Sequence, residues 1–403
     1  MDKKYIILVG DGMGDYPLES LGGRTPLEAA QTPNLDRLMR IGRLGLVRTV
    51  PAGMEPGSDV ANMSLLGYDP SVYHTGRGPL EAASMGLHLA PDEVAFRCNL
   101  VFLDRDASGA TIMGDYSAGH ISTPEARSII SSLESAVTGH PLKLYPGVGY
   151  RHLLVWKGGR DRMPTTPPHD ILGQAIAQYD KYSSQPILRS FIDSSAVILK
   201  DHPVNLERVE GGKVPANAVW LWGQGKAPSM PNLGEKFGLT GAMVSAVDLL
   251  KGIGVYAGLD PVTVPGVTGY LDTNYEGKVR ATLGALEKGN FAFLHLEAPD
   301  EASHEGSLEK KIEAIQNFDK RIIGPVVEGA RKFDRARILV VTDHFTPISR
   351  RTHVTDPVPF LIVDDLGAKN PPEGGSARFC ERDARDAGLY FDSGVDLFRN
   401  FIG

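Results

Sequence analysis

The chain has 403 residues, of which 42% are apolar and 23% charged, and its 42 basic against 49 acidic side chains give a net charge of -7. This composition is typical of a globular protein, and it excludes a basic nucleic-acid binder or a polybasic membrane-surface protein. The length predicts two domains, or one domain that carries an insertion. Two cysteines, Cys98 and Cys380, are too few for a disulfide framework and favour a reducing, cytoplasmic compartment.

The first predicted element is a strand at residues 5–9 (YIILV), which ends at Gly-Asp-Gly. An uninterrupted run of β-branched and aliphatic residues is typical of a strand buried on both faces of a parallel sheet. The run is too short to cross a membrane, and it ends in an acid rather than in a cleavage site. We therefore expect the first strand of a cytoplasmic protein, with Asp11 directly at its end.

Two helices are predicted next. Residues 32–39 begin with Thr32 as a cap and Pro33 in the first turn, and their apolar residues then recur at helical spacing. In residues 56–67, Gly57 and Ser58 precede a second helical pattern. Ser58 is thus expected at a helix N-terminus, where free backbone N–H groups favour an anion. The alternative is that Ser58 is only an N-cap, and Ser64, which falls within the helix, is a weaker candidate nucleophile.

The middle of the chain differs from its ends. Residues 91–244 are richer in turns, and their apolar segments are shorter. This change predicts an inserted α/β domain at 91–244 that interrupts a core domain formed by residues 1–90 and 245–403. We expect the assembled protein to be a monomer or a small homo-oligomer.

The C-terminal part again alternates strands and helices. Apolar runs at 291–297, 338–341 and 360–363 predict buried strands, and the periodic residues 308–327 predict a long helix. Strands alternating with helices at both ends of the chain predict an open, mostly parallel α/β sheet.

Acids and histidines follow three of these strands. Ligands of open α/β sheets bind at the carboxyl ends of the strands, where this chain places three aspartates and three histidines. They are Asp11, Asp300, Asp343, His304, His344 and His353. Each motif taken singly is common by chance, but a cluster of carboxylates is costly without a cation, and divalent cations bind carboxylate oxygens and imidazole nitrogens. Their joint occurrence predicts a metal centre, which would activate a nearby serine and stabilise a transferring phosphoryl group.

The ordered motifs resemble those of the archaeal-type cofactor-independent (2,3-bisphosphoglycerate-independent) phosphoglycerate mutases of the alkaline phosphatase superfamily. The resemblance extends over nearly the whole chain through DGMGD, TPLEAAQTPNLDRL, PGSDVANMSLLGYDP, GRGPLEAASMG, HLEAPDEASHEG and VTDHFTPISRRTHVTDPVPFLI. It implies an alkaline-phosphatase-like core interrupted by a cap domain. It also implies the interconversion of 3-phosphoglycerate and 2-phosphoglycerate through a phosphoserine, with glycerate held between core and cap.

The resemblance further implies two divalent-ion sites built from the side chains described above. One site would comprise Asp11, Ser58, Asp343 and His344, and the other Asp300, His304 and His353. Manganese is the expected metal, and zinc, cobalt and magnesium are alternatives. Ser58 would be the nucleophile that accepts the phosphoryl group from a small phosphorylated substrate.

Substrate binding is expected from cationic side chains in the inserted domain or at its hinge, because arginines recognise carboxylate and phosphate groups well. The candidates are Arg97, Arg151 and Lys251, for which a solvated or ion-paired surface position is the alternative. His120 and His152 are further candidates, with a structural role as their alternative.

One motif departs from the family pattern. Where archaeal mutases typically carry Asp-Arg-Arg-Ala-Gly-Arg-Ile, residues 115–121 read DYSAGHI. This stretch resembles a bacterial sister group for which a homoserine kinase role has been proposed. A phosphotransferase acting on an amino alcohol such as homoserine is therefore the first alternative, and a non-catalytic, metal-stabilised binding protein is the second.

Overall fold

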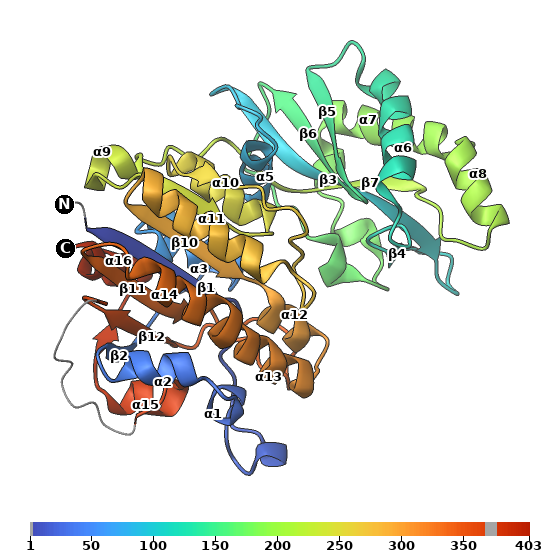
Figure 1. Cartoon of the computed structure of the whole chain (residues 1–403). Coiled ribbons are helices and arrows are strands. Elements are labelled where there is room, and N and C mark those ends of the chain that lie inside the picture. The colour runs from blue at the N-terminus through green and yellow to red at the C-terminus, as the bar shows by residue number, and fades with distance from the viewer. Residues whose placement is uncertain (1–2, 367–376) are drawn as a thin grey trace. The chain divides into compact units, whose positions relative to one another are not determined.

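The computed structural model describes residues 3–366 and 377–403 and divides the chain into two compact units (Figure 1). The larger unit comprises Met1–His74 and Ser229–Gly403, and the smaller unit is Thr75–Pro228. Both boundaries of the smaller unit lie earlier in the chain than the predicted boundaries of the inserted domain at 91–244. Helix α5 (Arg77–Ser84) belongs to the smaller unit because its Ala82 packs on that unit's strands, whereas strand β8 (Gly241–Val244) belongs to the sheet of the larger unit.

The described part of the larger unit contains an eight-stranded sheet in the order β13-β2-β12-β11-β1-β10-β8-β9. Its remaining strands are β1 (Lys4–Gly10), β2 (Arg43–Val47), β9 (Asp260–Pro261), β10 (Phe291–Leu296), β11 (Ala336–Thr342), β12 (Val358–Val363) and β13 (Tyr390–Phe391). Strand β1 runs parallel to both β10 and β11, while β12 is antiparallel to β11 and β2. The predicted mostly parallel α/β sheet is confirmed.

The register of the three central strands brings their carboxyl ends to the same level. Gly10 at the end of β1 lies opposite Leu296 of β10 and opposite Thr342 of β11. The loops that follow these strands therefore begin side by side, which is the arrangement that the polar residues after each strand require.

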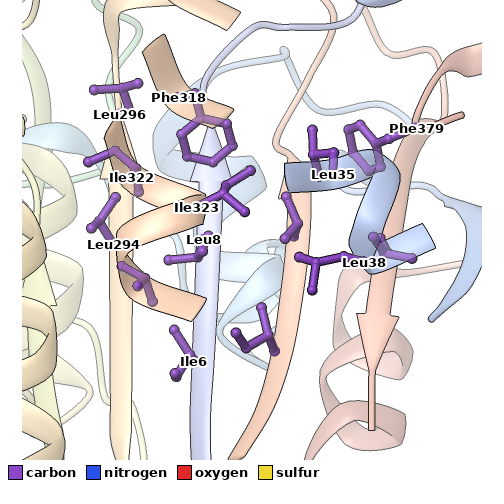
Figure 2. Close-up of a cluster of buried hydrophobic side chains, with 14 of the residues drawn as sticks. Ile6, Leu8, Leu35, Leu38, Leu294, Leu296, Phe318, Ile322, Ile323 and Phe379 are labelled. Atoms are coloured by element: carbon purple, nitrogen blue, oxygen red, sulfur yellow. The ribbon is translucent and has the colours of Figure 1, made fainter. Parts of the chain in front are cut away.

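Apolar side chains of the sheet pack against helices of the larger unit (Figure 2). The helical segments are η1 (Glu19–Leu21), α1 (Pro26–Ala29), α2 (Pro33–Met39), α3 (Ser58–Leu65), α4 (Pro70–Tyr73), α9 (Leu233–Phe237), α10 (Asp248–Tyr256), α11 (Tyr275–Lys288), α12 (Ala298–His304), α13 (Leu308–Asn317), η5 (Phe318–Ile323), α14 (Gly324–Ala330), α15 (Glu381–Asp386) and α16 (Gly394–Ile402). The predicted long helix at 308–327 is present, but its middle turn, η5, is a π-helix.

The start of helix α2 differs from its prediction in one respect. Pro33 occupies the first turn as expected, but within the described residues the Thr32 side chain makes no capping hydrogen bond. The Asp319 carboxylate of the π-helix accepts from the backbone N–H groups of Asn34 at 3.1 Å and Leu35 at 2.7 Å instead. A carboxylate from another segment thus takes the place of the local cap. This contact could not be predicted from the local sequence.

The described part of the smaller unit is built on a five-stranded antiparallel sheet. Its strands are β3 (Glu93–Arg105), β4 (Thr111–Asp115), β5 (Leu142–Val148), β6 (Arg151–Lys157) and β7 (Ala218–Gly225), and its longer helices are α5, α6 (Thr123–Val137), α7 (Pro186–Lys200) and α8 (Pro203–Glu210). The apolar faces of α6 and α7 complete its separate core. Across the described residues of both units, no helix has the length and apolar character needed to cross a membrane.

Candidate active site

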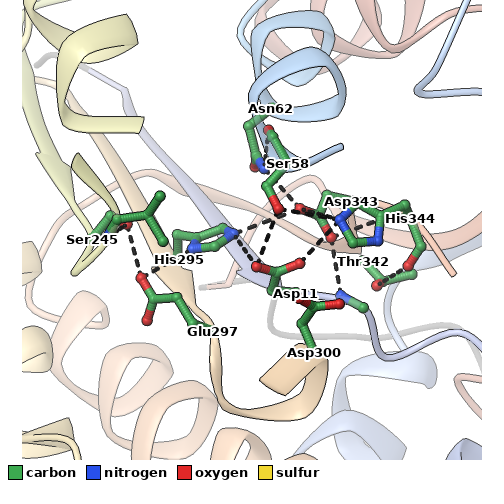
Figure 3. Close-up of polar contacts among 12 residues, drawn as sticks. Asp11, Ser58, Asn62, Ser245, His295, Glu297, Asp300, Thr342, Asp343 and His344 are labelled. Atoms are coloured by element: carbon green, nitrogen blue, oxygen red, sulfur yellow. Dashed lines mark hydrogen bonds and ion pairs between the residues drawn. The ribbon is translucent and has the colours of Figure 1, made fainter. Parts of the chain in front are cut away.

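Polar side chains converge where β1, β10 and β11 end (Figure 3). Asp11 follows β1, Asp300 lies in α12 just after β10, and Asp343 follows β11. Gly12, with φ +60°, lets the chain pass close to these groups, since a Cβ there would lie 2.6 Å from an Asp300 oxygen. The glycine after Asp11 is therefore required by the close approach of the strand ends.

Asp11, Asp343 and His344 form a first group whose ligand atoms all lie within 4.8 Å of one another. The Asp343 carboxylate is held in place by three donors. Its Oδ1 accepts from the backbone N–H of Gly12 at 3.1 Å and of His344 at 2.9 Å, and its Oδ2 accepts from Asn62 Nδ2 at 2.8 Å. The remaining lone pairs can face a cation.

Asp300, His304 and His353 form a second such group. His304 Nδ1 lies 2.9 Å from the Arg351 carbonyl, and His353 Nδ1 lies 3.3 Å from the Pro56 carbonyl. A carbonyl oxygen only accepts, so each Nδ1 donates its proton, and a neutral ring then presents Nε2 as a lone pair. The two Nε2 atoms are 3.0 Å apart and lie within 3.5 Å of the Asp300 oxygens.

Ser58 is the first residue of α3 and lies beside the first group. Its Oγ is 3.2 Å from His344 Nε2 and 3.4 Å from Asp11 Oδ2. One turn later in the helix, Asn62 donates to the Ser58 carbonyl at 2.8 Å while also binding Asp343. The helix start thus places a hydroxyl against the acidic cluster, as the sequence predicted.

The electrostatics of the cluster fit a bound cation. Burial, followed by the negative charges of Asp343 and Asp300, raises the pKa of Asp11 well above its usual value. Asp11 Oδ1 is buried and accepts no hydrogen bond from any described residue. Carboxylates and imidazoles that converge in this way are the donor set of hard and borderline divalent ions, so both groups suit such an ion.

Comparison with known proteins identifies the family. Residues 40–205 match the family model described as 2,3-bisphosphoglycerate-independent phosphoglycerate mutase. A probable 2,3-bisphosphoglycerate-independent phosphoglycerate mutase of Geobacter sulfurreducens is 53% identical over 400 residues, which are 99% of each chain. The chain belongs to this mutase family. A mutase of the same name from Methanosarcina acetivorans is 53% identical over 364 residues, covering 89% of this chain and 90% of the relative.

Solved structures support membership of the mutase family. A Pyrococcus horikoshii protein is 30% identical with a TM-score of 0.82, and the match covers 100% of this chain and 97% of that one. The cofactor-independent phosphoglycerate mutase of Thermoplasma acidophilum is 27% identical with a TM-score of 0.64, and both chains are covered completely. The fold of the whole chain is therefore that of known structures.

A second polar network beside this mutase-family site was not foreseen from the sequence. His295 Nε2 lies 3.2 Å from Asp11 Oδ2, and His295 Nδ1 lies 3.2 Å from Glu297 Oε1. Lys278 Nζ, from α11, donates to the other Glu297 oxygen at 2.7 Å. The available signal was the pair His295 and Glu297 at the end of a strongly apolar strand, where charged residues are rare. The sequence contained no signal for Lys278, because a lysine on a helix is ordinarily exposed.

Two of the arginines predicted to bind substrate lie on the smaller unit in different environments. Arg97 on β3 is buried and forms an ion pair with Glu81 at 2.6 Å, and its guanidinium lies 4.2 Å from the Trp222 ring centroid. Arg151 on β6 is exposed and lies beside Tyr150. Arg97 is thus ion-paired, as its alternative interpretation has it, but it is buried rather than on the surface, whereas Arg151 has a surface position from which it can reach a ligand.

The histidine candidates differ in the same way. His152 is buried on β6, where its Nδ1 accepts from the Gly147 N–H at 3.0 Å, and burial lowers its pKa to about 4. His120 is exposed in a turn with φ +49°. Lys251 lies on α10 of the larger unit, not in the inserted unit, and pairs with Asp248 at 3.2 Å. The five candidates therefore differ in burial and in their partners, and they are divided between the two units.

Proposed function

We propose that the protein interconverts 3-phosphoglycerate and 2-phosphoglycerate through a phosphoserine at Ser58. The observation that carries this proposal is the Ser58 hydroxyl at a helix start, 3.2 Å from His344 Nε2 and 3.4 Å from Asp11 Oδ2. Relatives more than 50% identical over nearly the whole chain bear the mutase name. A purely structural metal site would not need an open ligand position or a nucleophile beside it.

In the proposed reaction, Ser58 Oγ loses its proton and forms a bond to phosphorus as the bond from phosphorus to the C3 oxygen of the substrate breaks. The C3 oxygen takes up a proton and glycerate is left bound. The C2 hydroxyl of glycerate then loses its proton and forms a bond to phosphorus as the bond from phosphorus to Ser58 Oγ breaks, and Ser58 Oγ takes up a proton. The free N–H groups at the start of α3 favour the phosphoryl oxygens in both steps.

The residues proposed to hold divalent ions fall into the two groups described above: Asp11, Ser58, Asp343 and His344, and then Asp300, His304 and His353. When bound, the ions lower the cost of forming the serine alkoxide and balance the charge on the phosphoryl group. Manganese is our first choice, with zinc, cobalt and magnesium as alternatives. The carboxylates and hydroxyl suit hard cations, and the three imidazoles suit borderline ones.

The alternative substrate is an amino alcohol such as homoserine. The observation that favours it is the DYSAGHI stretch, whose exposed His120 stands where archaeal mutases typically carry an arginine. Fewer guanidinium groups weaken the recognition of a doubly anionic three-carbon acid. Arg151 and His120 remain our candidates for binding either substrate.

One pair of assays separates these functions. Protein loaded with manganese is incubated with 3-phosphoglycerate, and 2-phosphoglycerate is followed as enolase converts it to an absorbing product. In parallel, protein is incubated with homoserine and ATP, and phosphohomoserine is sought. We expect a signal in the first assay and none in the second. The reverse result would replace the mutase with the kinase, and silence in both at high enzyme concentration would favour a binding protein.

A further inference from the structure

Thr346 lies in the loop after β11 and is fully buried. Its hydroxyl contacts both candidate metal groups at once. Thr346 Oγ1 donates to Asp300 Oδ1 of the second group, and it lies 3.2 Å from Nδ1 of His344 in the first group. One hydroxyl thus joins the two groups without itself being one of their ligands.

The chemistry of these three side chains fixes the direction of each hydrogen bond. A hydroxyl has one proton to donate, and an ionised carboxylate only accepts. The Thr346 proton therefore points to Asp300, and an oxygen lone pair is left to face His344. His344 Nδ1 must then carry a proton and donate it to Thr346. The other ring nitrogen, Nε2, is left as the lone pair, and it lies 3.2 Å from Ser58 Oγ.

We propose that Thr346 is a positioning residue that sets the tautomer of His344 and thereby couples the two metal groups. The proposal rests on the proposed function only in taking the Nε2 lone pair as a ligand of the centre beside Ser58. Partners of this kind orient metal-binding imidazoles, and their removal typically lowers metal affinity about 10- to 100-fold.

The surroundings of Thr346 hold the hydroxyl in place. The buried Lys311 Nζ donates to the Thr346 carbonyl at 2.9 Å and to Asp15 Oδ2 at 2.9 Å. The Thr346 N–H donates to the Gly14 carbonyl at 3.2 Å. On the other side, a Cβ at position 12 would lie 2.6 Å from Thr346 Oγ1, so the glycine there leaves the space that the hydroxyl occupies. A side chain fixed by so many contacts can impose its geometry on His344.

The first test reads the tautomer directly. The metal-free full chain is labelled with nitrogen-15 histidine, and two-bond proton–nitrogen correlations are recorded at mildly alkaline pH. The His344 signals are assigned from their loss in His344→Asn. We expect wild-type His344 to carry its proton on Nδ1, Thr346→Ser to keep this tautomer, and Thr346→Val to shift it toward Nε2. A wild-type proton on Nε2, or a Thr346→Val spectrum identical to that of the wild type, would overturn the proposal.

The second test measures how the Thr346 hydroxyl affects the affinity for manganese, by calorimetric titration. Thr346→Val keeps the branched shape of the side chain but replaces the hydroxyl with a methyl group, and we expect it to bind manganese about 10- to 100-fold more weakly. Thr346→Ser should bind within a few-fold of the wild type. Thr282→Val is the matched control, because the Thr282 hydroxyl is also fully buried but donates to the Lys278 carbonyl at 2.9 Å. Equal affinity of Thr346→Val and wild type would contradict the proposal.

These measurements remain decisive in two unfavourable cases. If Thr346→Val does not fold, the wild-type spectrum and the serine variant still decide the tautomer. Neither readout contains a substrate, so a failed mutase assay would sink the proposed function without touching this inference. Conversely, a proton on His344 Nε2 in the wild type would overturn this inference and leave the proposed function untouched.

Discussion

His304 and His353 show how individual side chains are prepared for a metal. Each ring donates Nδ1–H to a backbone carbonyl, so that both Nε2 atoms turn toward Asp300. The orientation of the His304 ring does not follow from local sequence spacing, because the carbonyl that it contacts belongs to Arg351, which is distant in the sequence. The geometry of the second group is therefore set by contacts of His304, at the end of helix α12, and of His353 with loop segments distant in the sequence.

The proton on His304 predicts a pH dependence of metal binding. Burial lowers the pKa of His304, but the hydrogen bond and charge of Asp300 outweigh it and raise the pKa to about 9. Below this pH a bound ion must displace a proton, so affinity should rise with pH until about pH 9 and then level off. The predicted change is up to about tenfold per pH unit.

This dependence can be measured by manganese titration calorimetry in buffers of different ionisation enthalpy, which counts released protons. We expect proton release on binding below about pH 9, and less of it in His304→Asn. An affinity that does not change between neutral and alkaline pH, with no proton release, would contradict the assigned protonation of His304.

Single residues also show what sequence can and cannot reveal about the site. The positions of Asp11 and Asp343 at strand ends were predictable because each directly follows a strongly apolar run, which marks the end of a buried strand. Lys278 was not, since its partner Glu297 lies in another element and a helical lysine looks like a surface residue. Thr346 was missed because a threonine in a loop has no pattern that distinguishes it.

At the scale of elements, Glu297 joins three segments of the larger unit. Lys278 of α11 donates to its Oε2 at 2.7 Å, and the Ser245 hydroxyl and Ala246 N–H after β8 donate to its Oε1 at 2.9 and 2.8 Å. The ion pair is almost completely buried. Such a pair contributes little net energy while it is intact, but removing one partner leaves a buried charge without compensation.

Lys278→Met should therefore lower the free energy of unfolding by about 3–5 kcal/mol, as measured by urea denaturation. Lys288→Met is the matched control, because Lys288 is exposed on the same helix, and it should change stability by less than about 0.5 kcal/mol. Adding Glu297→Gln to Lys278→Met should recover part of the loss. Equal stability of Lys278→Met and wild type would show that Glu297 is not charged in the folded protein.

Glu381 at the start of α15 joins two other elements. Its carboxylate accepts from the Asp15 N–H at 3.0 Å and from the Thr25 hydroxyl at 2.7 Å, which caps α1. Burial raises the pKa of Glu381 to about 7. The folded protein thus binds a proton that the unfolded chain, with its ordinary carboxyl pKa, releases at lower pH.

The sign of the resulting pH effect follows from this difference. Between about pH 4.5 and 7 the folded state holds more protons at Glu381, so its contribution to stability falls as pH rises through this range, by roughly 3 kcal/mol in all. Glu381→Gln removes the titration and should flatten the decline in unfolding free energy over that window, as measured by urea denaturation at several pH values. An unchanged pH profile in the variant would contradict the raised pKa.

At the scale of the whole molecule, much of the architecture follows from apolar patterning. The runs at 5–9, 291–297 and 338–341 became central parallel strands as predicted. The run at 360–363 also became a strand, but an antiparallel one, because hydrophobicity records burial and not direction. The first unit boundary was placed too late because helix α5 reads as core sequence, although its apolar face packs within the smaller unit. The second was placed too late because strand β8 is short, although it pairs with β10 in the sheet of the larger unit.

The location of the site predicts how metal should act on the whole chain. The two groups draw their ligands from residues of the larger unit alone, in helix α12 and in the loops after β1 and β11. A bound ion should therefore slow amide hydrogen exchange near residues 11–15, 298–304 and 343–353, and leave residues 75–228 nearly unchanged in the absence of substrate. At a metal concentration 100 times the dissociation constant, linkage allows about 2.7 kcal/mol of added protection. Metal-induced slowing of amide exchange that is confined to residues 75–228 would contradict the proposed location of the metal site.

The central claim is that Ser58 carries the phosphoryl group between the two positions of the substrate. It is tested most directly by mixing manganese-loaded protein with 3-phosphoglycerate, quenching in acid during turnover, and mapping phosphate by mass spectrometry. We predict phosphate on the peptide that contains Ser58, and a loss of turnover of at least about 10³-fold in Ser58→Ala, with Ser64→Ala as the control. Phosphate on a different residue, or full turnover in Ser58→Ala, would contradict the account.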